Sequence, residues 1–409
     1  MNRYSRPVTR LSAAIRYASR ATRTYTDSSP ESSTDNSSEK VETPKQKKRV
    51  KPASGPGDAS ESNKIKIKGH SLLQGARLRR SFLYVPAHKE RFINKALTSA
   101  ADCIVLDLED GVAPSQRATA RENIKNLLHR LDKEGYKVGE NQRAELCIRV
   151  NHEGWLGSKH WAYRSDKDSV APSQELDQDL ELLAVPGSVK FPVTVVLPKT
   201  NTPYDLRNIR AVVMKKRQKL GRLGHDITRL AMIPTIETAL AIMNLPRFST
   251  HTKFFSAMVF AAEDYCASLG IPRTKDHSNM LLARSSIVTL CKMAGIPPID
   301  MVCQDFRDLE VLKRECEEGV YLGFEGKQAI HPDQIDTINK VFSLSAEEVE
   351  WATALLEAVK KNDADGTGAF EFEGKMVDRP VFRKAENILE KHRLIEEFEK
   401  DRFVTKVGF

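Results

Sequence analysis

Short apolar runs alternate with amphipathic stretches from Arg80 onward, and this alternation restricts the folds available to the chain. The predicted strands are residues 82–85, 103–106, 146–150, 193–197, 230–233, 257–262, 299–303 and 329–330. Helical patterns separate most of them, for example at 91–100, 119–131, 238–244, 279–294 and 305–318. Eight strands that alternate with helices over about 250 residues predict an α/β fold, a (β/α)8 or TIM barrel. An open doubly wound sheet is the alternative, but no G-x-G-x-x-G motif follows the first strand.

The barrel is predicted to span residues 73–344, and the sequence changes character after it. Residues 345–409 hold two further helical patterns and a Gly- and Asp-rich loop, at 346–361, 380–399 and 362–374. They add no strand to the barrel, so we predict a C-terminal helical arm or lid. Residues 152–178 are polar and are predicted to form a surface insertion between the third and fourth strands.

The N-terminus is rich in Arg, Ser and Thr and contains no acidic residue before Asp27. This composition is typical of a mitochondrial transit peptide, which we predict at residues 1–25, with a location in the mitochondrial matrix. A disordered basic tail is the alternative. Residues 26–72 have few large apolar side chains and are predicted to be a disordered linker, because they cannot offset the entropy lost on ordering.

Charge and hydropathy limit the partners that we expect. No apolar run approaches the roughly 20 residues of a membrane helix, so we expect a soluble protein without a membrane partner. The net charge of +9 invites a nucleic-acid interpretation, but much of the excess lies near the N-terminus. The basic run at 45–51 has no interleaved aromatic residues, so no nucleic-acid partner is expected. The six cysteines include no C-x-x-C pair and are expected to be reduced core thiols.

Carboxylates directly follow two of the predicted strands. Glu237 ends the run that begins near Leu230, and Asp264 follows the run at 257–262. A charge after a buried strand is unfavourable unless it is paired, and the carboxyl ends of barrel strands converge on one face. Two carboxylates with water and substrate oxygens are a usual arrangement for Mg²⁺, so both are predicted metal ligands. Helix capping is the alternative for Glu237 and for the neighbouring Glu263.

Other charged residues belong to the same predicted rim. Arg149 lies inside an apolar strand and is either a structural ion pair or a clamp for a developing negative charge. Asp107, Glu109 and Asp110 follow the second strand. We expect them to orient Arg149 or hold metal-bound water, and a purely structural role is the alternative. Lys199 follows the fourth strand. A Schiff-base role is open to it, but we expect it to pair with the carboxylates.

Eight short motifs occur in an order that is specific to one enzyme family. They are 80–86 (RSFLYVP), 105–112 (VLDLEDGV), 149–151 (RVN), 197–200 (LPKT), 236–238 (IET), 262–265 (AEDY), 326–332 (GKQAIHP) and 376–380 (MVDRP). On these motifs the chain resembles the citrate lyase β-subunit-like branch of the HpcH/HpaI aldolase family. The resemblance covers about residues 78–395 and is nearest to mitochondrial members that act on citramalyl-CoA.

The resemblance implies a Mg²⁺-dependent barrel that acts on acyl-CoA thioesters. It implies metal binding by Glu237 and Asp264, and substrate contact and charge stabilisation by Arg149. Asp378, in the C-terminal arm, matches the catalytic acid/base, and in relatives this arm covers the site of a neighbouring subunit within a trimer. The other positions implied to contact substrate or CoA are Tyr84, Arg91, Lys95, Ile330 and His331. From the residues alone, a solvated helix face competes for Arg91 and Lys95.

The implied reaction is reversible carbon–carbon cleavage of a 3-hydroxy-3-carboxyacyl-CoA of the citramalyl-CoA type. The products would be acetyl-CoA and a 2-oxoacid, pyruvate. Malyl-CoA lyase or malate synthase-like activity is the first alternative, and a non-catalytic mitochondrial CoA-binding barrel is the second. Ala87 stands where the family usually has Gly, and the insertion at 152–178 is a second departure.

Overall fold

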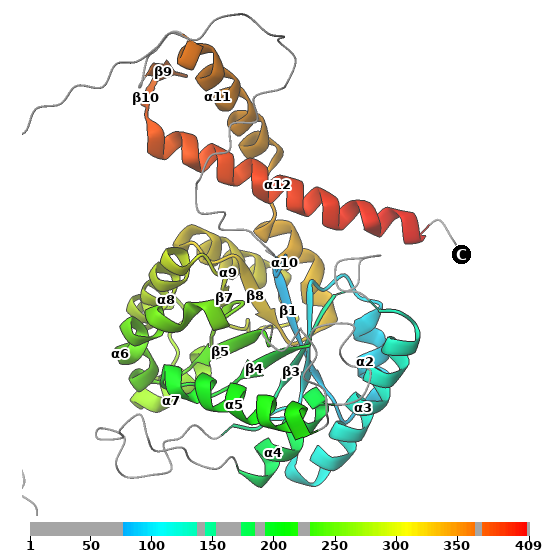
Figure 1. Ribbon diagram of the computed structural model, residues 1–409. Helices are drawn as coiled ribbons and strands as arrows, with labels where there is room; N and C mark the ends of the chain where they lie inside the picture. The colour runs from blue at the N-terminus through cyan, green and yellow to red at the C-terminus, as the bar shows by residue number, and fades with distance from the viewer. Residues whose placement is uncertain are drawn as a thin grey trace, which may run out of the picture. The chain divides into compact units, whose positions relative to one another are not determined.

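A computed structural model describes residues 77–136, 144–152, 173–184, 193–219, 230–364 and 370–406. Eight parallel strands close into a barrel in sequence order, from β1 round to β8, which pairs with β1 (Figure 1). The strands are β1 (Ser81–Pro86), β2 (Cys103–Asp107), β3 (Glu145–Arg149), β4 (Thr194–Leu197), β5 (Met232–Ile236), β6 (Met258–Phe260), β7 (Pro298–Asp300) and β8 (Gly326–Ala329). The predicted TIM barrel is confirmed.

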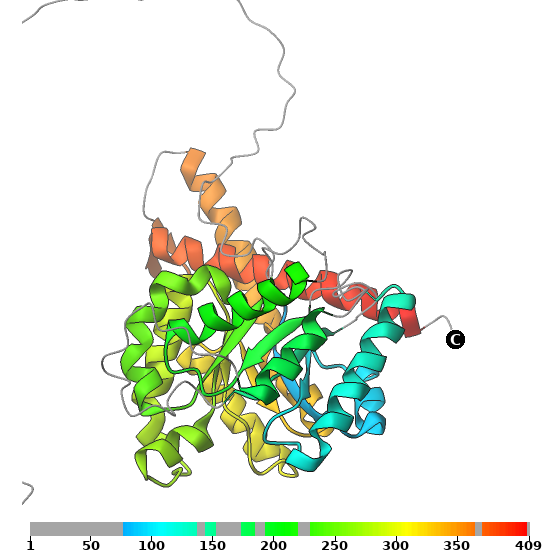
Figure 2. The ribbon, with the colours of Figure 1, turned by 60° about the horizontal axis from the view of Figure 1, so that its bottom comes forward.

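Helices surround the barrel, as Figures 1 and 2 show from two directions. They are α2 (Glu90–Leu97), α3 (Arg117–Lys133), α4 (Gln174–Glu181), α5 (Pro203–Lys219), α6 (Ala239–Phe248), α7 (Ala262–Leu269), α8 (Leu281–Ala294), α9 (Leu309–Leu322) and α10 (Ile335–Phe342). Short 3₁₀ turns are η1 (Pro114–Gln116), η3 (Leu182–Ala184), η5 (Ser249–Phe254), η6 (Ser278–Met280) and η7 (Pro332–Gln334). In the described part of the chain, no helix is long and apolar enough to cross a bilayer.

Side-chain alternation along the strands divides the apolar core in two, because successive residues of a strand point to opposite faces. One cluster is formed by strand residues or their neighbours: Phe82, Cys103, Val105, Cys147, Val196, Ile233, Ala257, Val259 and Ile299. A larger cluster combines the other strand residues with the buried faces of the helices. All six cysteines are buried and free, as predicted. Because apolar packing fills the middle of the barrel, reactive side chains are expected at the ends of the strands.

Ion pairs close the end of the barrel where the strands begin. Arg79 donates two hydrogen bonds to Glu145 at 2.6 and 3.1 Å, and Thr194 donates a further one to the same carboxylate. Arg80 forms a similar pair with Asp102, at 2.9 Å. These side chains are almost completely buried. A buried charge pair of this kind is held together by the large penalty for separating its members.

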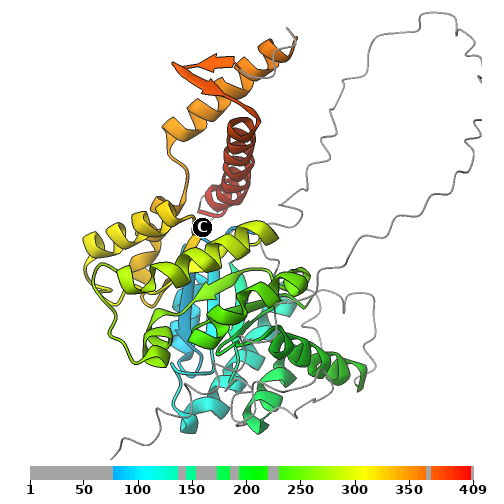
Figure 3. The ribbon, with the colours of Figure 1, turned by 90° about the vertical axis from the view of Figure 1, so that its left-hand side faces the viewer.

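The C-terminal arm has an apolar core of its own. It consists of α11 (Ala346–Ala364), β9 (Phe370–Phe372), β10 (Lys375–Val377) and α12 (Arg379–Lys406), and Figure 3 shows the short β9–β10 hairpin beside α11. Ala352, Leu355, Val377 and Ala385 are its buried centre. Polar contacts between α12 and the barrel include Glu399 with Arg80 at 3.1 Å and Lys391 Nζ with the Phe342 carbonyl oxygen at 3.0 Å.

Several predicted boundaries were wrong. β5 starts and ends later than 230–233, because Thr235 and Ile236 still pair with Val259 and Phe260 of β6. The predicted loop at 362–374 contains β9, which forms an antiparallel hairpin with β10. The predicted insertion at 152–178 ends in helix, since α4 begins at Gln174 and Ser173 caps it. Most of that insertion, and the predicted segments 1–25 and 26–72, lie outside the described residues.

Candidate active site

The carboxyl ends of the strands surround a cavity of about 260 Å³, which we call the mouth cavity. Residues on or just after six different strands meet here, among them Tyr84 of β1, Arg149 of β3, Asp264 after β6 and Ile330 after β8. The full lining is Tyr84, Pro86, Asp107, Gly111, Arg149, Ala261, Ala262, Glu263, Asp264, Val302, Gln328 and Ile330. The structure thus brings together predicted site residues that are far apart in the sequence.

Arg149 is held by carboxylates on one side and by an aromatic ring on another. Its guanidinium donates to both oxygens of Asp107 at 2.7 Å each and lies 3.2 Å from Glu109. It also stacks over the Tyr84 ring, 4.8 Å from the ring centre. Burial lowers the pKa of Arg149, but Asp107 outweighs that effect and raises it, so the charge is permanent. Arg149 therefore forms an ion pair and also lines the cavity, so both interpretations of this residue are compatible with the structure.

Asp107 is fixed in turn by the chain that follows it. Its two carboxylate oxygens accept the main-chain N–H groups of Glu109 and Gly111, at 2.9 Å each. Gly111 is required for this close approach, since a Cβ there would collide with the Asp107 carboxylate. Charge-assisted bonds of this kind are stronger than neutral ones, and here they orient the partner of Arg149.

Lys199 contacts three carboxylates of the site through different parts of the residue. Its Nζ lies 2.7 Å from Glu109 and 3.8 Å from Asp110, while its main-chain N–H donates to Glu237 Oε1 at 2.5 Å. Burial lowers its pKa, but the hydrogen bond and charge of Glu109 outweigh that effect and raise it. A Schiff-base lysine must lose its proton, so this environment favours the predicted charge-pairing role.

Glu237 and Asp264 remain without a cationic side chain within ion-pair distance among the described residues. Glu237 is 3% exposed, and burial together with the negative charges of Glu109 and Asp264 raises its pKa to about 8. Burial and the nearby Asp110 also raise the pKa of Asp264, which lies in the first turn of α7. Helix capping does not explain Glu237, because Thr238 caps α6 instead.

This arrangement fits a divalent cation with a preference for oxygen ligands. In the described part of the chain, no group of three or more His, Cys, Asp or Glu residues is placed to hold a metal alone. Arg149 and Lys199 already pair with Asp107 and Glu109, and two mutually repelling carboxylates are left over. Mg²⁺ is commonly bound by one or two carboxylates, water and substrate oxygens, which is the donor set available here.

The remaining predicted residues differ in their relation to the mouth cavity. Tyr84 lines it, and burial raises the pKa of its hydroxyl. Ile330 also lines it and is 46% exposed. His331 does not, because its ring caps η7, accepting from the Asp333 N–H at 3.3 Å and lying beside Phe306. A capping histidine is an ordinary structural role, which the sequence interpretation did not consider.

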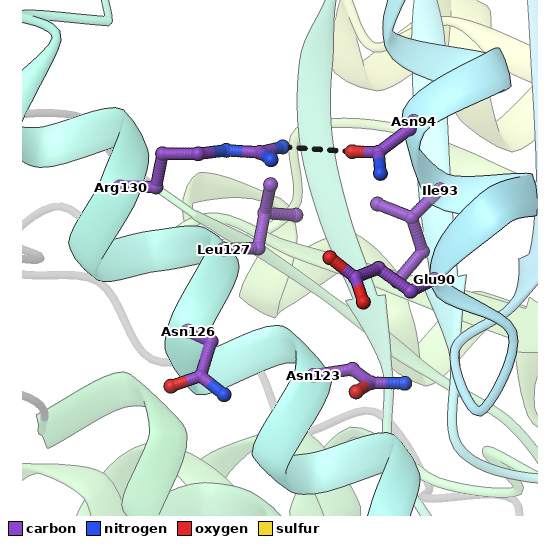
Figure 4. Close-up of a pocket in the computed structure, with 7 residues that line it drawn as sticks. All are labelled: Glu90, Ile93, Asn94, Asn123, Asn126, Leu127 and Arg130. Carbon is purple, nitrogen blue, oxygen red and sulfur yellow. Dashed lines mark hydrogen bonds between the residues drawn. The ribbon is translucent and has the colours of Figure 1, made fainter.

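Arg91 and Lys95 are exposed on α2 and do not line the mouth cavity. Figure 4 shows a second cavity, of about 160 Å³, between α2 and α3. Its lining includes Ile93, Leu127 and an Arg130–Asn94 hydrogen bond of 2.9 Å, but neither of the two predicted cations. The solvated-face alternative for Arg91 and Lys95 thus remains open.

Asp378 lies outside the mouth cavity, and none of the described residues of the arm lines that cavity. It is exposed and directly precedes α12, where its carbonyl oxygen accepts from the N–H groups of Val381 and Phe382. The polar contacts that Lys391 and Glu399 of α12 make with the barrel lie far along the helix from Asp378. Within one chain, the described residues give Asp378 no contact with the predicted metal ligands.

Gln328 is a cavity-lining residue that the sequence analysis did not single out. It is buried in β8 and donates through Nε2 to the carbonyl oxygens of Phe260 and Asp300, at 2.8 and 3.0 Å. These bonds join β8 to the ends of β6 and β7 beside the cavity. The available signal was a polar side chain in the motif at 326–332, just ahead of the predicted last strand.

The fold and the mouth cavity define a class: a TIM-barrel enzyme with a carboxylate-rich site suited to a divalent cation. Comparison with known families then identifies the lineage. Residues 80–164 and 172–332 match the family described as HpcH/HpaI aldolase/citrate lyase, and the chain belongs to this family. Its named relatives are lyases, and the chain is accordingly a carbon–carbon lyase.

Two relatives illustrate the range of the family. The mitochondrial citramalyl-CoA lyase of Homo sapiens is 35% identical over 317 residues, covering 76% of this chain and 84% of the relative. The L-malyl-CoA/beta-methylmalyl-CoA lyase of Rhodobacter capsulatus is 31% identical over 332 residues, covering 77% and 94%.

Solved structures have the same fold. Protein CitE from Mycobacterium tuberculosis, in complex with magnesium, acetoacetate and coenzyme A, is 27% identical with a TM-score of 0.55. The match covers 77% of this chain and 98% of that one. A citrate lyase from Burkholderia xenovorans has a TM-score of 0.61 at 21% identity, covering 80% and 96%. The second match bears on the fold alone.

Proposed function

We propose that this protein is a Mg²⁺-dependent acyl-CoA lyase that cleaves a 3-hydroxy-3-carboxyacyl-CoA of the citramalyl-CoA type. The products would be acetyl-CoA and pyruvate, in a reversible reaction. The observation that carries the proposal is a pair of unneutralised carboxylates: Asp264, which lines the mouth cavity beside Arg149, and the buried Glu237, whose charge interacts with that of Asp264. The names of the human and Rhodobacter relatives and the ligands of the Mycobacterium structure support the thioester substrate and the metal.

Glu237 and Asp264 would hold the cation, with water and substrate oxygens completing its ligands. Bound Mg²⁺ would act as a Lewis acid and orient the carboxylate and oxygen of the 2-oxoacid portion. Arg149, fixed by Asp107 and Tyr84, would stabilise the negative charge that develops as the carbon–carbon bond breaks. Its preset orientation means that little reorganisation accompanies the reaction.

Substrate contacts are proposed for residues in and beside the mouth cavity. Tyr84 and Ile330 would contact the acyl portion, because both line the cavity. His331, adjacent to Ile330, would contact substrate through the outer part of the same segment. Arg91 and Lys95 are exposed cations four residues apart, so both lie on one face of α2 and would meet CoA phosphates.

Asp378 would exchange the proton with the methyl carbon of acetyl-CoA. Because the described part of one chain gives it no contact with the mouth cavity, we propose that the arm delivers Asp378 to a neighbouring subunit, in a homotrimer. A mixing experiment tests this. Asp378→Asn and Glu237→Gln chains should each be inactive, and co-assembled chains should regain activity, because some sites then combine an intact arm with an intact barrel. Inactive mixed assemblies would contradict delivery between subunits.

The proposed location is the mitochondrial matrix, with residues 1–25 as the transit peptide, 26–72 as the linker, 73–344 as the barrel and 345–409 as the arm. The mitochondrial names of the human and rodent relatives support the organelle. Imaging of a tagged full-length chain beside one that lacks residues 1–25 tests the assignment. A mitochondrial signal that survives the deletion would contradict it.

The direct test of activity is a panel of acyl-CoA thioesters, followed by release of the 2-oxoacid. We expect cleavage of citramalyl-CoA that EDTA abolishes and Mg²⁺ restores. Faster cleavage of malyl-CoA, or net condensation with glyoxylate, would favour the malyl-CoA lyase or malate synthase-like alternative. A chain that binds CoA but cleaves no thioester would support the non-catalytic barrel. Borohydride trapping of substrate on Lys199 would replace the metal mechanism with a Schiff base.

A further inference from the structure

Lys199 has a backbone conformation that is uncommon for a residue with a side chain. Its φ is +50°, in the left-handed region, where the Cβ of any residue except Gly is crowded. Such residues persist only where the surrounding structure enforces them, and they concentrate at functional sites. Lys199 also contacts two carboxylates of the site. Its main-chain N–H donates to Glu237, and its Nζ donates to Glu109.

Hydrogen bonds from both sides enforce this turn. Asn201 donates through Nδ2 to the Lys199 carbonyl oxygen at 3.0 Å, and its Oδ1 accepts from the Thr238 hydroxyl. The Thr200 N–H donates to the Thr235 carbonyl oxygen at 3.3 Å, and the Asn201 N–H donates to Asp205 at 2.9 Å. The loop after β4 is thus joined to the residues on both sides of Glu237, and the position of the Lys199 N–H relative to Glu237 is fixed.

The N–H meets only one of the two Glu237 oxygens. It donates to Oε1 at 2.5 Å, and Oε2 has no hydrogen bond from a described residue. A cation chelated by both oxygens would be brought toward the positive end of this N–H dipole, whereas a cation on Oε2 alone would not. Ca²⁺ readily accepts two oxygens of one carboxylate, while Mg²⁺ requires near-octahedral geometry and usually takes one.

We propose that the left-handed turn at Lys199 is a metal-selecting device. Its main-chain N–H occupies Glu237 Oε1 and leaves Oε2 for the cation, which favours Mg²⁺ over Ca²⁺. Lys199 is here a positioning residue that acts through Glu237. The inference rests on the proposed magnesium site and adds the reason for its ion preference. It assigns the selectivity to the backbone of Lys199 and not to its charge.

Three substitutions separate the backbone from the side chain. Lys199→Gly keeps the N–H and adopts positive φ freely, but removes Nζ. Lys199→Met also removes the charge and keeps the length of the side chain. Lys199→Val removes the charge and, being β-branched, resists the left-handed region. Asn201→Ala is a second route, since it leaves Lys199 in place and removes two of the bonds that hold the turn.

The measurement is the affinity of each full-length, substrate-free variant for Mg²⁺ and for Ca²⁺, by titration calorimetry at one pH. We expect the ratio of the two affinities to stay within about threefold of the unchanged chain in Lys199→Gly and Lys199→Met. We expect Lys199→Val to shift it toward Ca²⁺ by about tenfold, because a charge-assisted hydrogen bond to Oε1 is lost. Asn201→Ala should shift it in the same direction.

The outcomes distinguish the inference from the function on which it rests. An equal shift in Lys199→Gly, Lys199→Met and Lys199→Val would assign the effect to the ammonium group and overturn the inference. An unchanged ratio in both Lys199→Val and Asn201→Ala would overturn it as well. If Lys199→Val does not fold, as circular dichroism would report, Asn201→Ala decides. If the unchanged chain binds neither ion, the magnesium site itself is wrong.

Discussion

The two ends of the barrel treat buried carboxylates in opposite ways. Where the strands begin, Glu145 contacts Arg79, Arg77 and Thr194. Burial by itself would raise the pKa of Glu145, but the charge of Arg79 and its hydrogen bond outweigh this effect and lower the pKa to about 2. Where the strands end, Glu237 is equally buried, and burial, Glu109 and Asp264 raise its pKa to about 8. Both residues are glutamates on or just after a barrel strand, so the neighbours alone account for the difference.

The comparison separates charges that hold the fold from charges that are free for chemistry. A paired buried carboxylate resists removal, because its partner would be left buried without a counter-charge. An unpaired one destabilises the folded chain until a cation or proton neutralises it. Strongly shifted carboxyl groups in a cleft therefore mark candidate functional sites. At the mouth of the barrel, the pKa values of Glu237 and Asp264 are raised. At the opposite end, the pKa of the paired Glu145 is lowered.

The largest expected effect is on catalysis at the mouth. Glu237→Gln should reduce lyase activity by at least about 10³-fold, because it removes a proposed ligand of the Lewis acid. Its free energy of unfolding without metal at pH 8 should be equal to or above that of the unchanged chain, since an uncompensated carboxylate is gone. Steady-state kinetics and urea unfolding measure the two quantities. Retention of more than a tenth of the activity would rule out Glu237 as an essential ligand.

Glu145→Gln, at the other end of the barrel, should lower stability and leave activity almost unchanged. Breaking this buried pair leaves Arg79 without its counter-charge and should lower the free energy of unfolding by about 3–5 kcal/mol. Activity per folded molecule should change little, because no residue of this ion pair lines the mouth cavity. Urea unfolding and active-site titration check these outcomes. A large loss of activity in fully folded protein would break the separation between the two ends.

Two glycines give a smaller and matched test. In Gly111→Ala the new Cβ would meet the Asp107 carboxylate, a side chain that holds Arg149, so we expect kcat to fall about 10–100-fold with little loss of stability. In Gly326→Ala the Cβ would meet the main-chain oxygen of Arg79, so stability and not chemistry should suffer. Kinetics and thermal unfolding of both variants show whether the expected contrast holds.

The smallest expected effect is a difference in pH dependence. Glu237 has a folded-state pKa near 8 against 4.5 when unperturbed, so without metal the folded chain binds the extra proton between these values. The contribution of Glu237 to stability should therefore fall as pH rises from 4.5 to 8, and the slope should be shallower in Glu237→Gln. Glu145 has a lowered pKa, so its contribution is lost as pH falls from 4.5 toward 2. Urea unfolding across pH, without metal, measures both slopes; equal slopes in Glu237→Gln and the unchanged chain would contradict the first.

Much of the fold was predictable because its signal is local. Eight apolar runs with helical stretches between them are sufficient to indicate a TIM barrel, and the strand-end positions of Glu237 and Asp264 follow from the same pattern. Strand ends were less accurate, as at β5, because pairing with a neighbour extends a strand past a residue such as Pro234. The cap formed by His331 was missed because a histidine side chain accepting from a main-chain N–H has no distinctive sequence pattern.

The sequence alone determined the order of the elements and the chemical types of the groups at the strand ends. Both depend on residue identity and on spacing along one segment. Tertiary structure alone decided which charges are neutralised: Arg149 and Lys199 pair with Asp107 and Glu109, and Glu237 and Asp264 are left unpaired. It also decided that the Lys199 N–H meets one oxygen of Glu237. Neutralisation depends on distances and burial between segments far apart in the sequence, which become defined only when the barrel closes.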